Sequence, residues 1–482
     1  MEVNKFAVLA SFIWKLLERG GTQVILFIVT IILARLLTPD DYGTVAIVMV
    51  LINLATVFVE GGLNTALIQK KNSDQTDYST IFYFSIVVAV VVYIIMFFSA
   101  PYIATFFSKP ELALIIKVLG ICLFFNAVNS VQRAYLYQNL LFRKLFVSSL
   151  TGAIISAIVG IAMAHLGYGI WSLVVQQLVL STLTTLVMWI TVRWRPTWTF
   201  SLDRFQSLFN YGWKIFVSNL SISLFINIRS LIIGRVFSAS SLAYFDRGKQ
   251  FPSLIMDNIN AAIQSVMFPV LSKEQDEIDV VKSMVKRSTL VSAYILYPIL
   301  VILCLMAKPL TILLLTEKWL DIVPFIQIFC IANLFMPIQN VNMEAIKSLG
   351  YSGITLKLEL IKKILEIAIL IATVYVGVYA IAWGVVIYNA ICVFINLSPC
   401  EHLYDYSIRE QIKDNMPSLY LSVLLAVLLY GLKFIPFSPF LEIVIGSIIG
   451  IIFYLSLSKI FRVNPYVYLE NMFFRLIKKS SI

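Results

Sequence analysis

The stretch IWKLLERGGTQVILFIVTIILARLL (residues 13–37) recurs in outline as GWKIFVSNLSISLFINIRSLIIGRVF (residues 212–237) in the second half of the chain. Both segments have a Trp-Lys pair near the start and an arginine near the end. Two further pairs follow in the same order: NSVQ (129–132) with QNVN (339–342), and HLGYGIWSLV (165–174) with YVGVYAIAWGV (375–385). Duplicated apolar halves are typical of transporters that are built from two related repeats with a binding site between them.

The composition is that of an integral membrane protein. Hydrophobic residues make up 60% of the 482 residues, charged residues only 13%, and the mean hydropathy is +0.89. A soluble chain has about twice that charged fraction. The first apolar segment contains charges and lacks a small-residue cleavage site, so we expect it to remain as a signal anchor. The 5 cysteines and 2 histidines have no metal-ligand spacing, which predicts neither a metal site nor a cofactor.

A helix needs about twenty apolar residues to cross ~30 Å of hydrocarbon, which predicts an all-α protein with about fourteen spanning helices. Six lie in each half, and two at the C-terminal end have no counterpart. They fall near residues 10–37, 42–69, 79–100, 112–137, 144–165, 168–192, 205–233, 239–270, 286–307, 320–346, 355–376, 379–398, 417–433 and 439–460. The polar linker RWRPTWTFSLDR (193–204) predicts an N-lobe at 1–200, a C-lobe at 201–400, and two helices with a basic tail at 401–482.

The basic residues predict the orientation of these helices. If the N-terminus is cytoplasmic, most loop lysines and arginines are cytoplasmic too, and the positive-inside rule then predicts both termini in the cytoplasm. The net charge of +11 reflects this topology and attraction to anionic lipid head groups. No soluble basic domain is present to bind nucleic acid, and the predicted outward loops are too short to form a catalytic domain.

Ionisable residues inside the predicted spans are candidate functional groups, because each costs about 2.5–3.5 kcal/mol at mid-helix on insertion scales. The cationic candidates for substrate binding are Lys15, Arg19, Lys214, Arg229, Arg247 and Lys249. The acidic candidates for ion coupling or charge pairing are Glu18, Glu60, Asp257 and Glu344. For the first-span cluster and for Arg229, the alternative is a side chain that snorkels to the membrane surface.

Sequence context suggests partners for some of these groups. Lys15, Glu18 and Arg19 share one helix face, and Glu60 needs either protonation or a partner such as Arg19 or Lys15. Gly248 and Pro252 predict an irregular backbone beside Arg247 and Lys249. Farther along, Glu359 and Glu366 are spaced to pair with the neighbouring Lys362 and Lys363.

A crevice that is lined by lysine and arginine suits an anionic substrate, and phosphate or pyrophosphate fits best. The sequence contains no GxxxxGK[ST] phosphate-binding loop, which argues against ATP hydrolysis. Transport energy then comes from an ion gradient, the membrane potential or substrate mass action.

Five segments carry a family resemblance: ILARLLTPDDYG (32–43), EGGLNTALIQKK (60–71), RAYLYQNLLFRK (133–144), MFPVLSK (267–273) and LLTEKWLDIVPFIQIFCIANLF (314–335). Together they resemble polysaccharide-export flippases of the Wzx and WzxC type. These proteins belong to the multidrug/oligosaccharidyl-lipid/polysaccharide (MOP) exporter superfamily, which includes the MATE transporters. The resemblance extends from the first span to about residue 400, and the last two spans fit it by number only.

The resemblance implies two pseudo-symmetric six-helix lobes around a cationic cavity in a bacterial inner-membrane protein. The implied substrate is an undecaprenyl-pyrophosphate-linked oligosaccharide, which alternating access turns to the outer leaflet for O-antigen, capsule, exopolysaccharide or teichuronic-acid synthesis. Lys15, Arg19, Lys214, Arg247 and Lys249 are assigned to the substrate path. Arg35 and Arg235, at matching outer helix ends, are interpreted as gate or loop-capping residues.

The implied partners are membrane lipids and a polysaccharide polymerase with its chain-length machinery, and a monomer suffices because both lobes are present. Coupling to H⁺, to Na⁺ or to no ion is left open. The alternatives are a lipid II flippase or a cation-coupled multidrug antiporter of the same superfamily. A membrane-bound polysaccharide polymerase or ligase is a distant alternative, and we expect no enzymatic activity.

Overall fold

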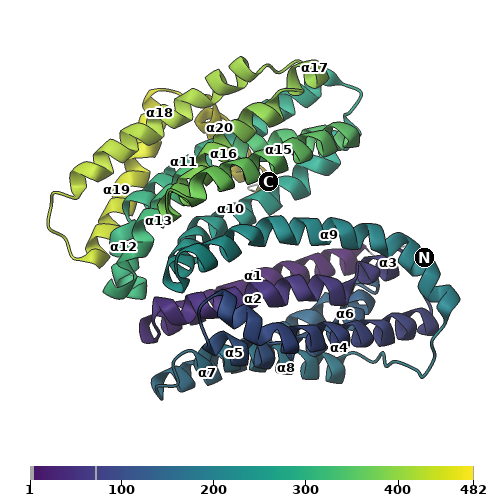
Figure 1. The fold of residues 1–482 in the computed structure, drawn as a ribbon. Coiled ribbons are helices and arrows are strands. Elements are labelled where there is room, and N and C mark those ends of the chain that lie inside the picture. Colours follow the sequence, from purple (N-terminus) through teal and green to yellow (C-terminus); the bar gives the residue numbers. More distant parts are fainter. Residues whose placement is uncertain (1–4, 71–72, 481–482) are drawn as a thin grey trace. The chain divides into compact units, whose positions relative to one another are not determined.

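The computed structural model describes residues 5–70 and 73–480, except for the side chains of residues 5–13, 15–19, 261–262, 264–266, 268–269 and 473–480. All regular elements in these ranges are helices (Figure 1). They form two compact units, Met1–Ala243 and Tyr244–Ile482. The all-α architecture is therefore as predicted.

Within the described residues, nine complete helices belong to the first unit. They are α1 (Lys5–Leu36), α2 (Pro39–Glu60), α3 (Leu63–Gln69), α4 (Gln75–Phe106), α5 (Glu111–Leu119), α6 (Cys122–Gln138), α7 (Phe142–His165), α8 (Trp171–Thr191) and α9 (Leu202–Val236). Capping boxes begin two of them: Thr38 with Asp41 at α2, and Asp74 with Asp77 at α4. Each box satisfies backbone N–H groups that have no partner within the helix.

Packing in this unit places α1 on α7, α7 on α8, and α4 on α5 and α6. Helix α9 packs on α2, α3 and α4, which is why the boundary between the compact units follows α9. The predicted lobe boundaries at residues 200 and 400 follow the sequence repeat and stay a prediction. A core of buried residues, including Leu63, Leu67, Ile81 and Leu136, fills the region around α3, α4 and α6.

The second unit begins within α10 (Ala239–Lys273), and its described residues continue through ten further α-helices and one 3-10 helix. They are α11 (Ile278–Leu305), α12 (Ala307–Leu315), η1 (Glu317–Ile322), α13 (Val323–Asn333), α14 (Met336–Ser348), α15 (Ser352–Val374), α16 (Val378–Leu397), α17 (Cys400–Tyr404), α18 (Ile408–Leu432), α19 (Pro439–Ile460) and α20 (Asn464–Ser480). Large side chains such as Trp319, Phe325 and Tyr404 are fully buried in it.

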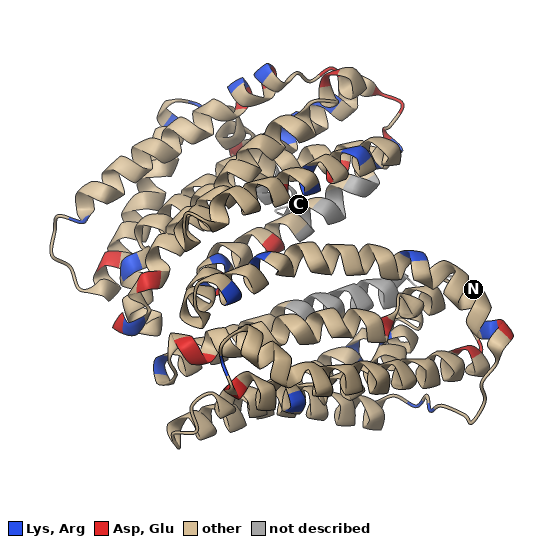
Figure 2. Ribbon diagram, viewed as in Figure 1, with Lys and Arg blue, Asp and Glu red and all other residues tan. Residues whose placement is uncertain are grey.

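The helices are suited to a bilayer. Among the described residues, 10 helices are long and apolar enough to span it, or 11 if the bent pair Glu317–Asn333 and Met336–Ser348 forms one span. Most other expected spans are helical as well. They include α15, which carries Lys357, Glu359, Lys362, Lys363 and Glu366, and α1, in which the described stretch Gly20–Leu36 is apolar. Charged positions lie mainly toward helix ends (Figure 2). The chain is a multi-pass membrane protein, and the count of fourteen remains a prediction.

Two predicted spans are broken. The span expected at 42–69 divides at Gly61 and Gly62, whose φ angles of 55° and 68° end α2 and begin α3. The span expected at 320–346 bends by 42° between α13 and α14. Glycine is the residue that adopts positive φ without a steric penalty, so the Gly-Gly pair explains the first break.

Candidate functional site

The predicted substrate-binding cations are divided between the two units. Lys15, Glu18 and Arg19 belong to α1, but their side chains lie outside the described residues. The neighbouring Trp14 ring is 5.6 Å from the Phe146 ring and 5.6 Å from the Arg143 guanidinium. This end of α1 therefore rests on the start of α7.

Helix α9 meets the α2–α3 break at a glycine contact. A Cβ atom on Gly62 would lie 2.3 Å from the Gly212 carbonyl oxygen and 2.7 Å from the Phe216 nitrogen. The Phe58 and Phe216 rings pack edge to face at 5.3 Å. Only a residue without a side chain permits this approach, so Gly62 fixes how α9 lies against α2 and α3.

Lys214 follows this contact by two residues. Its side chain is exposed, and it makes no hydrogen bond or ion pair with any residue that the structure describes. An unpaired ammonium group in an apolar helix is costly unless water or an anion reaches it. Of the predicted cations, Lys214 is thus well suited to receive an anionic ligand.

Glu60 lies half-buried at the end of α2, immediately before the break. The charge that acts on it among the described residues is Arg133 of α6. The sequence did not indicate this partner, because Arg133 is remote from Glu60 in the chain and lies on a different helix. The predicted pairing of Glu60 with Lys15 or Arg19 stays a prediction, because the side chains of Lys15 and Arg19 lie outside the described residues.

Arg229 is half-buried near the far end of α9 and has an interaction partner. At ~1.5 Å per residue, the 35 residues of α9 extend about 52 Å. This length exceeds the ~30 Å hydrocarbon core, so α9 projects beyond the core and its charged ends can reach polar surroundings.

In the second unit, Arg247 and Lys249 lie on a continuous α10, and the predicted irregular backbone is wrong. Gly248 has a packing role instead: a Cβ atom there would lie 2.4 Å from the Phe325 Cβ. Arg247 donates a hydrogen bond to Gln250 at 2.7 Å, while Lys249 is exposed and has an interaction partner. Asp257, on the same helix, is also exposed and partnered.

The remaining predicted charges have local structural contacts. The Lys347 ammonium is 2.9 Å from the buried Glu344 carboxylate. On α15, the predicted pairing is confirmed by Lys362 with Glu359 at 2.5 Å and Lys363 with Glu366 at 3.1 Å. These contacts favour a charge-pairing role for Glu344.

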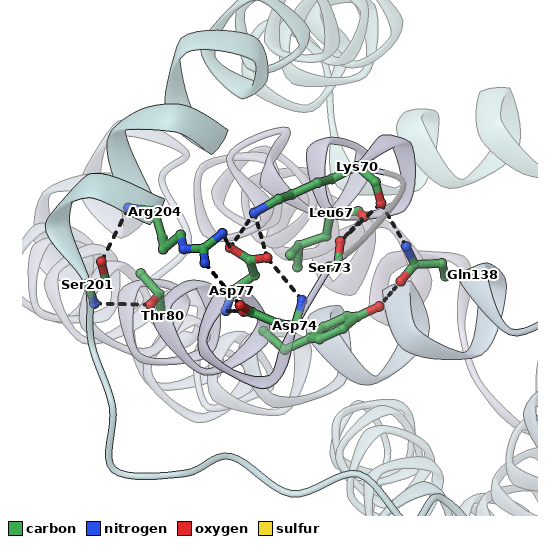
Figure 3. A network of polar contacts seen from close by, with 10 residues as sticks. Leu67, Lys70, Ser73, Asp74, Asp77, Thr80, Gln138, Ser201 and Arg204 are labelled. Atoms are coloured by element: carbon green, nitrogen blue, oxygen red, sulfur yellow. Dashed lines mark hydrogen bonds and ion pairs between the residues drawn. The ribbon is translucent and has the colours of Figure 1, made fainter.

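A cluster that the sequence did not reveal holds the start of α9 to α4 (Figure 3). We call Lys70, Asp74, Asp77 and Arg204 the Asp77 cluster. The fully buried Asp77 carboxylate accepts hydrogen bonds from Lys70 at 2.6 and 2.7 Å. Arg204 lies 3.1 Å from Asp74 and 3.8 Å from Asp77. The hydrogen bond from the Asp77 backbone N–H, with help from Arg204 and Lys70, lowers the pKa of the Asp74 carboxyl group.

Backbone hydrogen bonds extend this attachment along the linker between α8 and α9. The Thr197 N–H donates to Ser79 at 3.0 Å, and the Ser201 N–H donates to Thr80 at 3.2 Å. These bonds join the linker to the start of α4, beside the buried Asp77 carboxylate. The linker is therefore a fixed part of the first unit.

The other end of α9 is held by the TPDDYG segment. A Cβ atom on Gly43 would lie 1.7 Å from the Ala239 carbonyl oxygen, so the α9–α10 corner rests directly on the start of α2. Lys109 pairs with Asp40 and donates to Thr44 at 2.9 Å. The Arg235 guanidinium lies 4.8 Å from the Phe106 ring centre. This contact agrees with a structural role for Arg235, and Arg35 has an interaction partner as well.

The repeated polar segments are buried packing elements. In the first, Asn129 donates to Thr185 at 2.7 Å. In the second, Asn342 donates to Gln411 at 2.8 Å and accepts from Tyr404 at 2.5 Å. Among the described residues, no group of His, Cys, Asp or Glu side chains has the geometry of a metal site.

Solved structures show which fold this protein has. The lipid II flippase MurJ, in an inward closed conformation, matches with a TM-score of 0.72 and 16% identity over 95% of this chain and 98% of that chain. An inward-facing multidrug resistance MATE family transporter of the MOP superfamily matches with a TM-score of 0.60 and 15% identity over 79% of this chain and 94% of that chain. The chain therefore has the fold of MOP superfamily transporters.

Residues 32–324 match the model of the family described as polysaccharide biosynthesis protein, and the chain belongs to this family. It is 23% identical to the succinoglycan biosynthesis transport protein ExoT of Rhizobium meliloti over 66% of this chain. The match spans 64% of the length of ExoT, slightly under two thirds. It is 22% identical to the lipopolysaccharide biosynthesis protein WzxC of Escherichia coli over 83% of this chain and 82% of WzxC. The family resemblance is confirmed.

Proposed function

We propose that this protein moves undecaprenyl-pyrophosphate-linked oligosaccharides from the cytoplasmic to the outer leaflet of a bacterial inner membrane. The family match over residues 32–324 carries this proposal. The product would serve assembly of a surface polysaccharide of the O-antigen, capsule, exopolysaccharide or teichuronic-acid type. Both termini are cytoplasmic in this scheme, in accordance with the basic loops.

The substrate's pyrophosphate is the chemical group that the cations would bind. The predicted cations offer ammonium and guanidinium donors, and one guanidinium can bind two phosphate oxygens at once. These cations are Lys15, Arg19, Lys214, Arg229, Arg247 and Lys249. Lys214 supports this role most directly, because it is exposed and unpaired with respect to the described residues. The lobes would expose these groups to each side of the membrane in turn.

Glu60 and Asp257 are proposed for ion coupling or charge pairing, with H⁺ or Na⁺ as the coupling ion if there is one. The Arg133 charge near Glu60 favours pairing at that position. A polysaccharide polymerase and its chain-length machinery would receive the flipped lipid, and one chain would be a functional unit.

Lipid II flipping is the second candidate, because its substrate carries the same pyrophosphate and the MurJ fold matches over 95% of this chain. A multidrug antiporter is disfavoured, because an organic cation is not attracted by a surplus of lysine and arginine.

Membrane vesicles from the native host provide the test. We expect that depletion of this protein traps lipid-linked oligosaccharide in the cytoplasmic leaflet, where a lectin labels it in inside-out vesicles only. Lys214→Ala should trap it too, while Lys357→Ala, an exposed lysine on α15, should not. Trapped lipid II, with the oligosaccharide unaffected, would favour the second candidate.

A further inference from the structure

Two hollows flank the first turn of α20 in the second unit. One, of about 310 Å³, lies between α11 and α20 and is lined by Lys286, Arg287, Leu290 and Tyr468 among others. The other, of about 420 Å³, lies between α18 and the α19–α20 corner and includes Arg462 and Leu424. Asn464 and Pro465 line both hollows, so the two hollows adjoin each other at the start of α20.

Each hollow has one arginine that forms no ion pair with a described carboxylate. Arg287 is exposed, and its guanidinium stacks on the Tyr468 ring at 4.7 Å. Arg462 is also exposed, at a corner with a φ of 45°. Neither arginine has an ion pair within the part of the chain that the structure describes.

The other charges around the hollows compensate one another. Lys286 lies 2.8 Å from the Asp414 carboxylate and 3.9 Å from Glu410. The Tyr406 hydroxyl donates a second hydrogen bond to Asp414 at 2.8 Å. Asp414 is thus satisfied by two donors, which leaves the guanidinium groups of Arg287 and Arg462 as the available charge.

Apolar side chains continue from these cations along the spanning helices. On α11, Leu290 and Val291 follow Arg287 by three and four residues and line the same hollow. On α18, Leu421 and Leu424 line the second hollow together with Phe461. A site that combines exposed cations with an aliphatic wall fits a ligand that has an anionic head group and an acyl chain.

We infer that this site binds an anionic phospholipid of the surrounding membrane, with its phosphate on Arg287 and Arg462 and an acyl chain along Leu290 and Leu424. Helix α20 supports this assignment, because its sequence NPYVYLENMFFRLIKKS combines apolar residues with a basic end, as helices that lie in the membrane interface do. An inorganic phosphate ion could bind the two arginines, but it has no apolar part to contact the aliphatic walls. The inference is independent of the transported substrate.

Native mass spectrometry of the full-length protein in detergent measures this binding directly. With phosphatidylglycerol as the probe, each guanidinium near the phosphate contributes about 1 kcal/mol, or about fivefold in affinity. We therefore expect Arg287→Gln with Arg462→Gln to weaken binding by roughly 25-fold. Lys433→Gln, which removes an exposed cation at the other end of α18, should leave it unchanged.

Two further arms make the result decisive. Phosphatidylcholine, whose head group is neutral overall, should bind equally weakly to wild type and to the double variant. Millimolar inorganic phosphate should not displace phosphatidylglycerol. Equal phosphatidylglycerol affinities for wild type and double variant would overturn the inference, and so would displacement by phosphate alone. Arg287→Lys, which keeps the charge, should retain most of the binding, and the double glutamine variant should keep the wild-type midpoint of thermal unfolding, so that a loss of binding is attributed to the missing charge.

Discussion

Replacement of Lys70 by methionine would remove the nearer of the two cations that face the buried Asp77 carboxylate. Lys70 contacts both carboxylate oxygens, at 2.6 and 2.7 Å, whereas Arg204 is 3.8 Å away. Removal of one partner from a buried pair costs about 3–5 kcal/mol, because it leaves an uncompensated charge. Lys70 is 26% exposed and the Asp74 N–H still donates to Asp77, so we expect the lower end, about 3 kcal/mol.

Arg204→Met is the matched comparison within the same cluster. Arg204 is 44% exposed and its closest contact is the equally accessible Asp74, so its loss should cost about 1 kcal/mol or less. For a unit of this size, 1 kcal/mol lowers the midpoint of thermal unfolding by roughly 2–4 °C. The expected shifts are thus roughly 6–12 °C for Lys70→Met and at most about 4 °C for Arg204→Met.

The assay is thermal unfolding of the purified protein in detergent, followed by the fluorescence of its tryptophans. Lys70→Met combined with Asp77→Asn should recover part of the loss, because no buried charge is then left unpaired. Equal midpoints for Lys70→Met and Arg204→Met, or no recovery in the double variant, would refute the view that the buried carboxylate dominates this cluster.

Two other substitutions test the packing. Gly62→Ala should destabilise the protein by more than 1 kcal/mol, since a Cβ would lie 2.3 Å from the Gly212 carbonyl oxygen at a φ of 68°, and strain at such positions costs about 1–3 kcal/mol. Gly20→Ala, whose Cβ would have no described atom within 4 Å and which lies inside α1, should be neutral or stabilise the protein by up to about 1 kcal/mol in the same unfolding assay. Tyr404→Phe should lower the free energy of unfolding by about 1–3 kcal/mol, because it removes the hydroxyl group that donates to the buried Asn342 at 2.5 Å. An unchanged midpoint of thermal unfolding would show that this hydrogen bond contributes nothing to stability.

The helical architecture could be predicted from the sequence because a bilayer imposes a simple rule on the chain. An apolar run of the right length must form a helix there, since no water is present to satisfy the backbone. The spans predicted at 144–165 and 439–460 agree closely with α7 and α19. The break at Gly61–Gly62 was not predicted, because the span expected at 42–69 rested on apolar length, and apolar length alone does not reveal where a helix ends.

The contacts that fix the helices against one another could not be predicted. Arg204 forms an ion pair with Asp77, and the charge of Arg133 acts on Glu60. Neither pair is close in sequence. Such pairs follow from which helix faces meet, and that depends on contacts such as Gly62 with Gly212. The irregular backbone expected at Gly248 was wrong for the same reason. A glycine in a helix serves close packing as readily as it serves a bend.

Transbilayer movement of the substrate tests the central claim most directly. Proteoliposomes that contain the purified protein and a fluorescent undecaprenyl-pyrophosphate oligosaccharide would be exposed to an external lectin, with and without an imposed proton or sodium gradient. We predict that the protein brings the sugar of inner-leaflet lipid to the lectin much faster than protein-free liposomes do. Sugar that stays protected at the protein-free rate, together with gradient-driven export of organic cations by the same liposomes, would contradict the proposed flippase function.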